Sequence, residues 1–200
     1  MNPLNSVKGA ITTGVVIALV VMLLIAPTGF QELSLARWLH ILSGVMWIGL
    51  LWYFNVVQIP ALGVAAADKG GPGGAGITKY VAPRALFWFR WAALATWLTG
   101  AWYLLRAGNF VGAFTLGGTS DPFNYYQLII GVGAWLGTIM LFNVWVLIWP
   151  NQKKVLGIVP ANDEEKAAAR KTATLASRIN FVLSIPMLLC MGAATHGLPF

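Results

Sequence analysis

The hydrophobic residues of this chain form five long, continuous runs, and short segments between them hold most of the polar residues. Each run is near the ~20 residues that a helix needs to cross a bilayer. The runs do not alternate between apolar and polar positions, which argues against membrane strands. The pattern therefore predicts an all-α bundle of five transmembrane helices in a single membrane domain, residues 1–200. The expected spans are about 9–25, 33–57, 85–105, 125–149 and 174–195.

The composition excludes several classes of protein. Hydrophobic residues make up 58% of the chain and charged residues 10%, whereas soluble domains have about 45–50% and about 25%. So few charges cannot cover the surface of a soluble globule. A soluble enzyme, a nucleic-acid-binding protein and a disordered tail are therefore all poor interpretations, and membrane lipid is the expected surrounding. The net charge of +7 comes from basic residues between the apolar runs, where they act as topology signals.

The basic residues also predict the orientation. With a cytoplasmic N-terminus, all of the thirteen Lys and Arg residues except Arg37 and Arg106 lie on the inner side. Such a bias follows the positive-inside rule and predicts an N-in, C-out topology. The first run follows Lys8 and could be a signal peptide. It is long for one and no A-x-A cleavage site follows it, so we expect a retained membrane helix.

The segments between the runs differ in kind. Residues 61–78 are rich in Gly and Ala and predict a flexible inner loop. They lack the Gly-Lys-Ser/Thr of a phosphate-binding loop. Residues 151–172 carry mixed charges at helical spacing and predict a short surface helix that leads into the fifth span. Residues 107–123 are expected to lie on the membrane surface or to pack over the bundle.

Two histidines are the residues most able to carry chemistry within these apolar spans. The chain has only His40 and His196, and the predicted topology places both near the outer end of their helices. Two neutral imidazoles on separate helices can ligate a haem iron from opposite faces. We therefore expect a haem b with His40 and His196 as its metal ligands.

The sequence around His40 suits a flat macrocycle. Ser43 and Gly44 lie one turn further along the helix and leave room beside it, and Trp47 follows on the same face. The two haem propionates need cations or water, and Arg37 and Arg106 are the basic residues expected on that side. The predicted cofactor-binding residues are therefore Arg37, His40, Ser43, Gly44, Trp47, Arg106 and His196.

Simpler interpretations remain open at this stage. The histidines could hydrogen-bond within the bundle or lie exposed, they could hold copper or zinc, and the two arginines could extend to the interface. Polar residues expected nearer the inner side could fix helix packing or line a pocket for a small molecule or quinone. They are Asn55, Gln58, Arg90, Asn143, Arg178 and Asn180. The GxxxG of Gly133 and Gly137 permits close helix contact within this chain or in a homo-oligomer. Cys190 is expected to be a packing residue.

Three stretches resemble a known family. They are RWLHILSGVMWIGLLWYFNVVQIPAL, VAPRALFWFRWAALATWLTG and NVWVLIWPNQKKVLG. They are similar to the membrane-embedded N-terminal domain of bacterial urate oxidases of the cytochrome-fused type. The spacing of His40, Trp47 and Gly49 is also similar to other small haem-associated membrane families, including the membrane protoporphyrinogen oxidase and the copper-resistance D proteins.

The resemblance implies a redox-linked bundle in a bacterial inner membrane, with His40 as the position to carry over. The chain has no CxxCH motif, so any cytochrome c is expected to be a separate polypeptide. The leading hypothesis is a b-haem protein that relays electrons toward a periplasmic acceptor. The alternative is a non-catalytic structural subunit of a larger respiratory or oxidase complex. A third interpretation, an enzyme acting on a purine or porphyrin, would need a pocket of convergent polar groups, for which the region around Arg90 is the candidate.

Overall fold

The computed structural model describes residues 2–25 and 29–199, and within these ranges it contains helices and no strand. The chain divides into two compact units, Met1–Ser34 and Leu35–Phe200. The first unit holds a short 3-10 helix, η1 (Pro3–Asn5), and α1 (Val7–Ile25), followed by the first residues of α2. α1 is apolar on all sides and buries none of its residues, as expected of a helix whose solvent is lipid.

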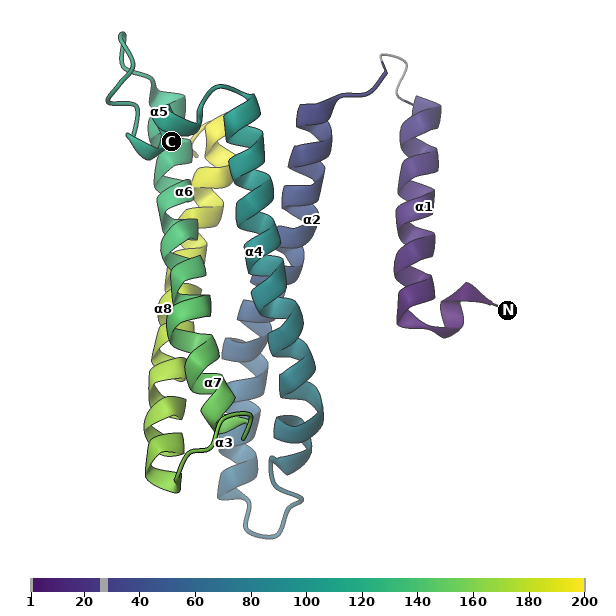
Figure 1. Cartoon of the computed structure of the whole chain (residues 1–200), viewed down its shortest axis with the longest axis vertical. Helices are drawn as coiled ribbons and strands as arrows, with labels where there is room; N and C mark the ends of the chain where they lie inside the picture. Colours follow the sequence, from purple (N-terminus) through teal and green to yellow (C-terminus); the bar gives the residue numbers. More distant parts are fainter. Residues whose placement is uncertain (1, 26–28, 200) are drawn as a thin grey trace. The chain divides into compact units, whose positions relative to one another are not determined.

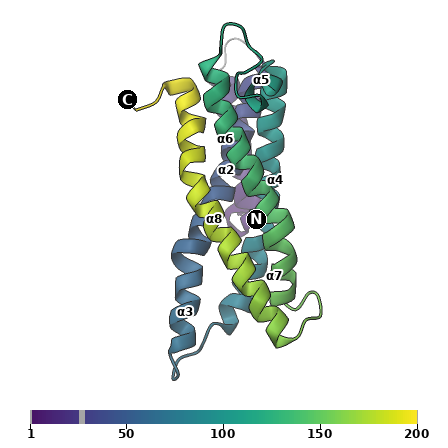
Figure 2. The ribbon, with the colours of Figure 1, turned by 90° about the vertical axis from the view of Figure 1, so that its left-hand side faces the viewer.

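The second unit consists of two successive helical hairpins (Figures 1 and 2). The four long helices lie side by side, and α5 lies at the end of the bundle where α6 begins. The first hairpin comprises α2 (Glu32–Trp52), η2 (Tyr53–Gln58), α3 (Ile59–Ala67), η3 (Ile77–Val81) and α4 (Ala82–Arg106). The second follows α5 (Phe110–Phe114) and comprises α6 (Tyr125–Phe142), η4 (Asn143–Ile148), α7 (Trp149–Val155) and α8 (Asp163–His196).

In the described part of the chain, three helices contain a π-helical turn, and each turn ends two residues before a proline. In η2, η3 and η4 the last turn closes from residue i to i−5, for example from the Ile59 N–H to the Phe54 carbonyl. A proline ring clashes with the carbonyl four residues earlier and cannot donate to it. The wider turn relieves that clash without ending the helix. Pro60, Pro83 and Pro150 thereby modify their helices instead of terminating them.

The two hairpins also share a sequence pattern at corresponding places. Trp47, Gly49, Phe54 and Asn55 of the first hairpin recur at the same spacing as Trp135, Gly137, Phe142 and Asn143 of the second. In both hairpins the shared asparagine lies in the π-helical turn. The second unit is therefore built from two similar halves, which allows equivalent positions to be compared.

The structure confirms the all-α fold class and agrees in part with the predicted spans. Within residues 2–25 and 29–199, four helical segments are long and apolar enough to cross a membrane: Val7–Ile25, Glu32–Ala67, Tyr125–Val155 and Asp163–His196. They correspond to the first, second, fourth and fifth predicted spans. The predicted third span is α4, a helix of 25 residues. It is not one of the four, because its three arginines and its tryptophans and tyrosine lower its hydropathy.

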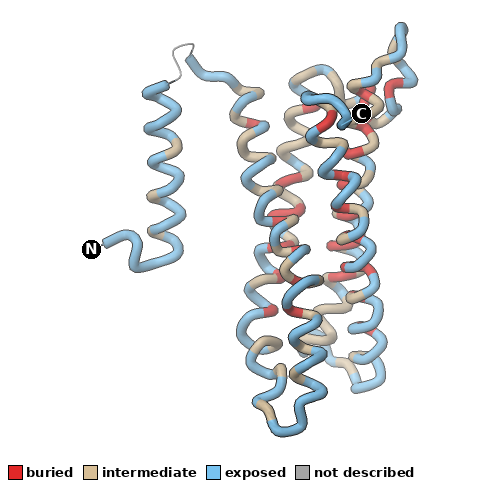
Figure 3. Tube along the Cα trace, turned by 180° about the vertical axis from the view of Figure 1, so that it is seen from behind, coloured by how far each residue is buried: buried red, intermediate tan, exposed pale blue. Residues whose placement is uncertain are grey.

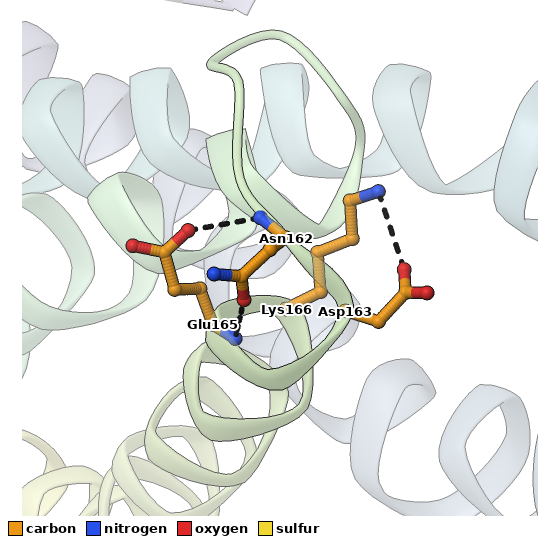
Figure 4. A network of polar contacts seen from close by, with 4 residues as sticks. All are labelled: Asn162, Asp163, Glu165 and Lys166. Atoms are coloured by element: carbon orange, nitrogen blue, oxygen red, sulfur yellow. Dashed lines mark hydrogen bonds and ion pairs between the residues drawn. The ribbon is translucent and has the colours of Figure 1, made fainter.

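The fifth predicted span is longer than expected, because no separate surface helix precedes it. α7 ends at Val155, and α8 runs without a break for 34 residues from Asp163. A capping box starts α8 (Figure 4). The side chain of Asn162 accepts from the Glu165 N–H at 2.8 Å, and the Glu165 carboxylate accepts from the Asn162 N–H at 2.9 Å. This pair satisfies two N–H groups at the helix start. An ion pair between Lys166 and Asp163 at 3.8 Å lies beside it.

The core of the second unit lies where the helices face one another, and their outward faces are exposed (Figure 3). Large exposed apolar side chains on those faces suit contact with lipid. The most completely buried large side chains are Trp47, Leu51, Phe89, Met140 and Val144. Trp47 lies in this core and also reaches the cavity described next.

Candidate functional site

The second unit contains a cavity of about 420 Å³ between its helices. Side chains from α2, α4, α5, α6 and α8 line it, toward the end of the bundle where α2 begins and α8 ends. Most of its walls are apolar, and its larger apolar side chains include Trp47, Trp97, Phe114, Ile130, Met187 and Met191. A concave, mostly apolar site with a few polar groups is typical of a binding site for a cofactor or small molecule.

Both histidines of the chain line this cavity. His40 lies on α2, and His196 is the last residue of α8. His40 is half-buried and His196 is exposed. The structure therefore brings together two side chains that the sequence predicted to act as a pair.

A hydrogen bond fixes which nitrogen of His40 can act as a ligand. The Nδ1 atom lies 2.7 Å from the carbonyl oxygen of Thr96 on α4. A carbonyl oxygen can only accept, so Nδ1 carries the proton and donates. A charged imidazolium would be costly among these apolar walls. The ring is therefore neutral, with a lone pair on Nε2, the arrangement found in histidines that bind a metal through Nε2.

The contacts between α2 and α8 place the two histidines at a similar height in the bundle. Trp52 Nε1 donates to the Ser184 hydroxyl at 3.3 Å. His40 precedes Trp52 by as many residues as His196 follows Ser184. Because α2 and α8 run in opposite directions, both histidines lie toward the same end of the bundle. Since both helices rise about 1.5 Å per residue, the two histidines lie near the same level.

Arg37 is the basic residue at this cavity. Its guanidinium carbon lies 5.5 Å from the centre of the Tyr103 ring, and Tyr103 and Tyr126 line the cavity with it. Sequence reasoning missed both tyrosines, although each is an aromatic residue with a hydroxyl near the outer end of its helix. Arg106, which was predicted to share the role of Arg37, is exposed at the end of α4 and is not one of the lining residues.

Of the three other predicted residues of α2, one lines the cavity and two do not. Trp47 lines the cavity, is 2% exposed, and its indole N–H has no hydrogen-bond partner among the described residues. Ser43 and Gly44 do not line the cavity. The Ser43 hydroxyl donates to the Leu39 carbonyl at 2.7 Å. A Cβ atom on Gly44 would lie 3.7 Å from the Thr96 methyl group, an ordinary contact distance, so this glycine faces α4 and leaves room for a methyl group.

The predicted inner polar cluster forms packing hydrogen bonds. Asn143 Nδ2 donates to Asn180 Oδ1 at 2.8 Å, and Asn180 Nδ2 donates to the Met140 carbonyl at 2.9 Å. Asn55 Nδ2 donates to the Ser177 hydroxyl at 2.9 Å. These contacts join η2, η4 and α8, as the packing interpretation expects.

The remaining members of that cluster are placed differently. Arg90 stacks over Trp149, with the guanidinium carbon 3.8 Å from the ring centre. Arg178 is exposed, and the Gln58 side-chain oxygen is buried with no partner among the described residues. These residues do not converge on one group, which weakens the interpretation of the region around Arg90 as a substrate pocket.

We predict that the Asn143–Asn180 hydrogen bond contributes about 1 kcal/mol to the stability of the bundle, the usual range for polar contacts between membrane helices. A double-mutant cycle with Asn143→Ala and Asn180→Ala, followed by unfolding from detergent micelles, measures this coupling. A second cycle that pairs Asn143→Ala with Asn162→Ala serves as the control, since the exposed Asn162 is not expected to couple to Asn143. A coupling free energy indistinguishable from zero for the Asn143–Asn180 pair would contradict the prediction.

The GxxxG motif is used within the chain at its first glycine. A Cβ on Gly133 would lie 3.2 Å from Cys190 Cβ and 3.1 Å from Met191 Cε, both on α8. Gly137 is buried and lines the cavity. Close packing of α6 on α8 therefore explains this motif, and Cys190 is a packing residue of that contact.

Within residues 2–25 and 29–199, no group of three or more His, Cys, Asp or Glu residues is arranged to hold a metal ion. The cavity offers two imidazoles. Two histidines suffice for a haem iron, because the porphyrin supplies the other four nitrogen ligands.

Comparisons with known proteins identify one similarity. Residues 118–200 match the family model described as urate oxidase N-terminal. These residues include α6, η4, α7 and α8. The resemblance to that family is confirmed over this part of the chain, which contains His196 but not His40. No curated protein and no solved structure matches the chain.

Proposed function

We propose that this chain is a bacterial inner-membrane protein that binds one haem b in the cavity and relays electrons toward a periplasmic acceptor, such as a separate cytochrome c. The observation that carries the proposal is that the only two histidines of the chain line one apolar cavity. A bis-histidine haem needs two imidazoles on separate helices with room for a flat macrocycle between them.

The residues present fit this group. Nε2 of His40 is free to ligate because Nδ1 is engaged by the Thr96 carbonyl, and the exposed imidazole of His196 would be the second ligand. The Arg37 guanidinium and the Tyr103 and Tyr126 hydroxyls are the polar groups that would pair with the propionates. Haem, when bound, supplies one-electron chemistry. The apolar walls would lower the polarity around the haem and so tune its reduction potential.

We further propose five transmembrane spans in the N-in, C-out orientation. α4 lies among helices that are apolar enough to span, and its arginines lie near its two ends or stack on Trp149. Most of the basic residues of the second unit lie in the segments at the end of the bundle opposite the cavity, from Lys69 to Arg84 and from Lys153 to Lys171. With that end cytoplasmic, the cavity lies on the periplasmic side.

A reduced-minus-oxidised visible spectrum of the purified protein tests the proposal. The wild type is expected to show a b-type α-band with one haem per chain. We expect His40→Ala to lose the band, and His196→Ala to lose it or convert it to a five-coordinate spectrum. Lys154→Ala, at the other end of the bundle, is the control and should leave the spectrum unchanged.

The outcomes separate the proposal from its alternatives. A band that survives His196→Ala unchanged would remove His196 as a ligand. A wild type that contains no haem after expression with adequate haem supply would overturn the proposal. It would favour the structural-subunit hypothesis, for which co-purifying membrane proteins would then be the measurement.

A further inference from the structure

We propose that Gly100 is a positioning residue for His40: its missing side chain leaves the space in which the imidazole reaches the Thr96 carbonyl and turns Nε2 toward the cavity. This inference deepens the proposed function and rests on it for its consequence in the haem-loaded protein. The position of the imidazole itself can be tested without haem.

The geometry at Gly100 is closer than any side chain would permit. A Cβ atom on Gly100 would lie 2.8 Å from Cε1 and 3.0 Å from Nδ1 of His40, and 3.8 Å from Nε2. Carbon atoms without a bond between them prefer separations of about 3.5–4.0 Å. The Cε1–Nδ1 edge of the ring therefore lies against the α4 backbone, and Nε2 is the ring nitrogen farther from Gly100.

The group that a side chain at Gly100 would displace is the imidazole of His40. The three atoms nearest to a Cβ at this position all belong to that ring. An added methyl group would therefore displace the ring rather than the helix, since a side chain rotates at lower cost than a helix backbone shifts.

Displacement of the ring would leave its N–H without a partner, whereas the carbonyl would keep one. The Thr96 carbonyl also lies 3.0 Å from the Thr99 hydroxyl. The imidazole has no comparable second acceptor: its one hydrogen bond across the described residues is to Thr96. The cost of a displacement therefore falls on His40, which would change rotamer or transfer its proton to Nε2.

This matters for ligation because the Nδ1–H···O bond does two things. It holds the tautomer in which Nε2 is unprotonated, and it raises the electron-donating strength of Nε2 toward a metal. Loss of this hydrogen bond would make His40 a weaker and less well oriented ligand. In the haem-loaded protein, Gly100→Ala is therefore expected to raise the midpoint potential and weaken haem retention.

The decisive experiment is nitrogen-15 NMR of the full chain in detergent micelles without haem, with histidine labelled in its ring. The chain has two histidines, so His40→Ala assigns both imidazoles and His196 serves as an internal reference in every sample. For wild-type His40 we expect a protonated Nδ1 with a proton shift typical of a hydrogen bond, and an unprotonated Nε2. In Gly100→Ala the Nδ1–H signal should move upfield or the tautomer should switch, with His196 unchanged.

Two controls separate positioning from general disturbance. Gly49→Ala adds the same methyl group to α2 where nothing lies within 4 Å of the new Cβ, and Gly44→Ala adds it at an ordinary contact distance. Both should leave the His40 signals in place.

A His40 ring protonated at Nε2 in the wild type, or unchanged His40 signals in Gly100→Ala, would overturn the proposal. The wild-type spectrum decides the first point even if Gly100→Ala does not fold. A wild type that takes up no haem would refute the proposed function, whereas the NMR measurement would still decide the role of Gly100.

Discussion

Trp47→Ala is expected to destabilise the bundle by about 3 kcal/mol, the largest loss among the substitutions considered. Trp47 is 2% exposed and packs in the core while also forming part of the cavity wall. Removal of a buried aromatic side chain costs about 3–5 kcal/mol, because the surrounding structure only partly fills the space. The loss is expected at the lower end of this range because the cavity borders one side of the ring, so fewer packing contacts are lost. Its indole N–H has no partner whose loss would add to the cost.

Trp135→Ala provides a matched control for this prediction. Trp135 occupies the equivalent position in the second hairpin, but it is 44% exposed and donates to the Phe114 carbonyl at 3.1 Å. Its loss is expected to cost about 1 kcal/mol, the net value of one hydrogen bond. Unfolding of both variants from the same micelles measures the difference. Equal losses of stability would show that Trp47 is not a core residue.

The helical spans could be predicted from the sequence because the bilayer demands long apolar runs. Their ends could not, because a proline in an apolar run has two outcomes. The predicted second and fourth spans end at residues 57 and 149, yet the helices continue through Pro60 and Pro150 by way of η2 and η4. Whether a proline ends a helix or widens one turn depends on tertiary packing on the far side of the turn, which local sequence does not specify.

Two signals in the sequence could have improved the prediction. Asn162 and Glu165 form the N-x-x-E spacing of a capping box. They mark the start of α8 directly, which excludes a separate surface helix. The recurrence of Trp47, Gly49 and Phe54 at the spacing of Trp135, Gly137 and Phe142 indicates two similar hairpins. That short pattern lies inside apolar runs, where hydropathy alone does not distinguish it.

The depth of the candidate-site residues in the membrane could be predicted from the sequence. The side of the helix on which each residue lies could not. Topology placed Arg37 and Arg106 on the same side of the membrane, yet only Arg37 lines the cavity. Hydropathy gives the height of a residue in the bundle, whereas the face that it presents follows from packing of α4 against α2 and α6. For the same reason Gly100 carried no signal in the sequence. Its role depends on a close contact with His40 on another helix.

The attachment of α5 to the bundle depends on a glycine of α6, and Gly131→Ala is expected to loosen it. A Cβ atom on Gly131 would collide with the Ala113 carbonyl of α5 and would lie 3.1 Å from Leu116 Cδ2. The carbonyl belongs to the backbone, so the whole α5 segment has to move. Overpacking of this kind costs about 1–3 kcal/mol. Phe114, which lines the cavity from α5, would move with that segment.

Hydrogen–deuterium exchange of the protein in micelles measures this detachment. In Gly131→Ala we expect faster exchange across residues 107–124, with little change in α8, because the bundle itself does not depend on this contact. Gly137→Ala is the control on the same helix, since nothing lies within 4 Å of its Cβ position although the residue is buried. Unchanged protection of residues 107–124 in Gly131→Ala would show that this contact does not hold α5 in place. If protection falls, the attachment of α5 to the bundle depends on this one backbone contact.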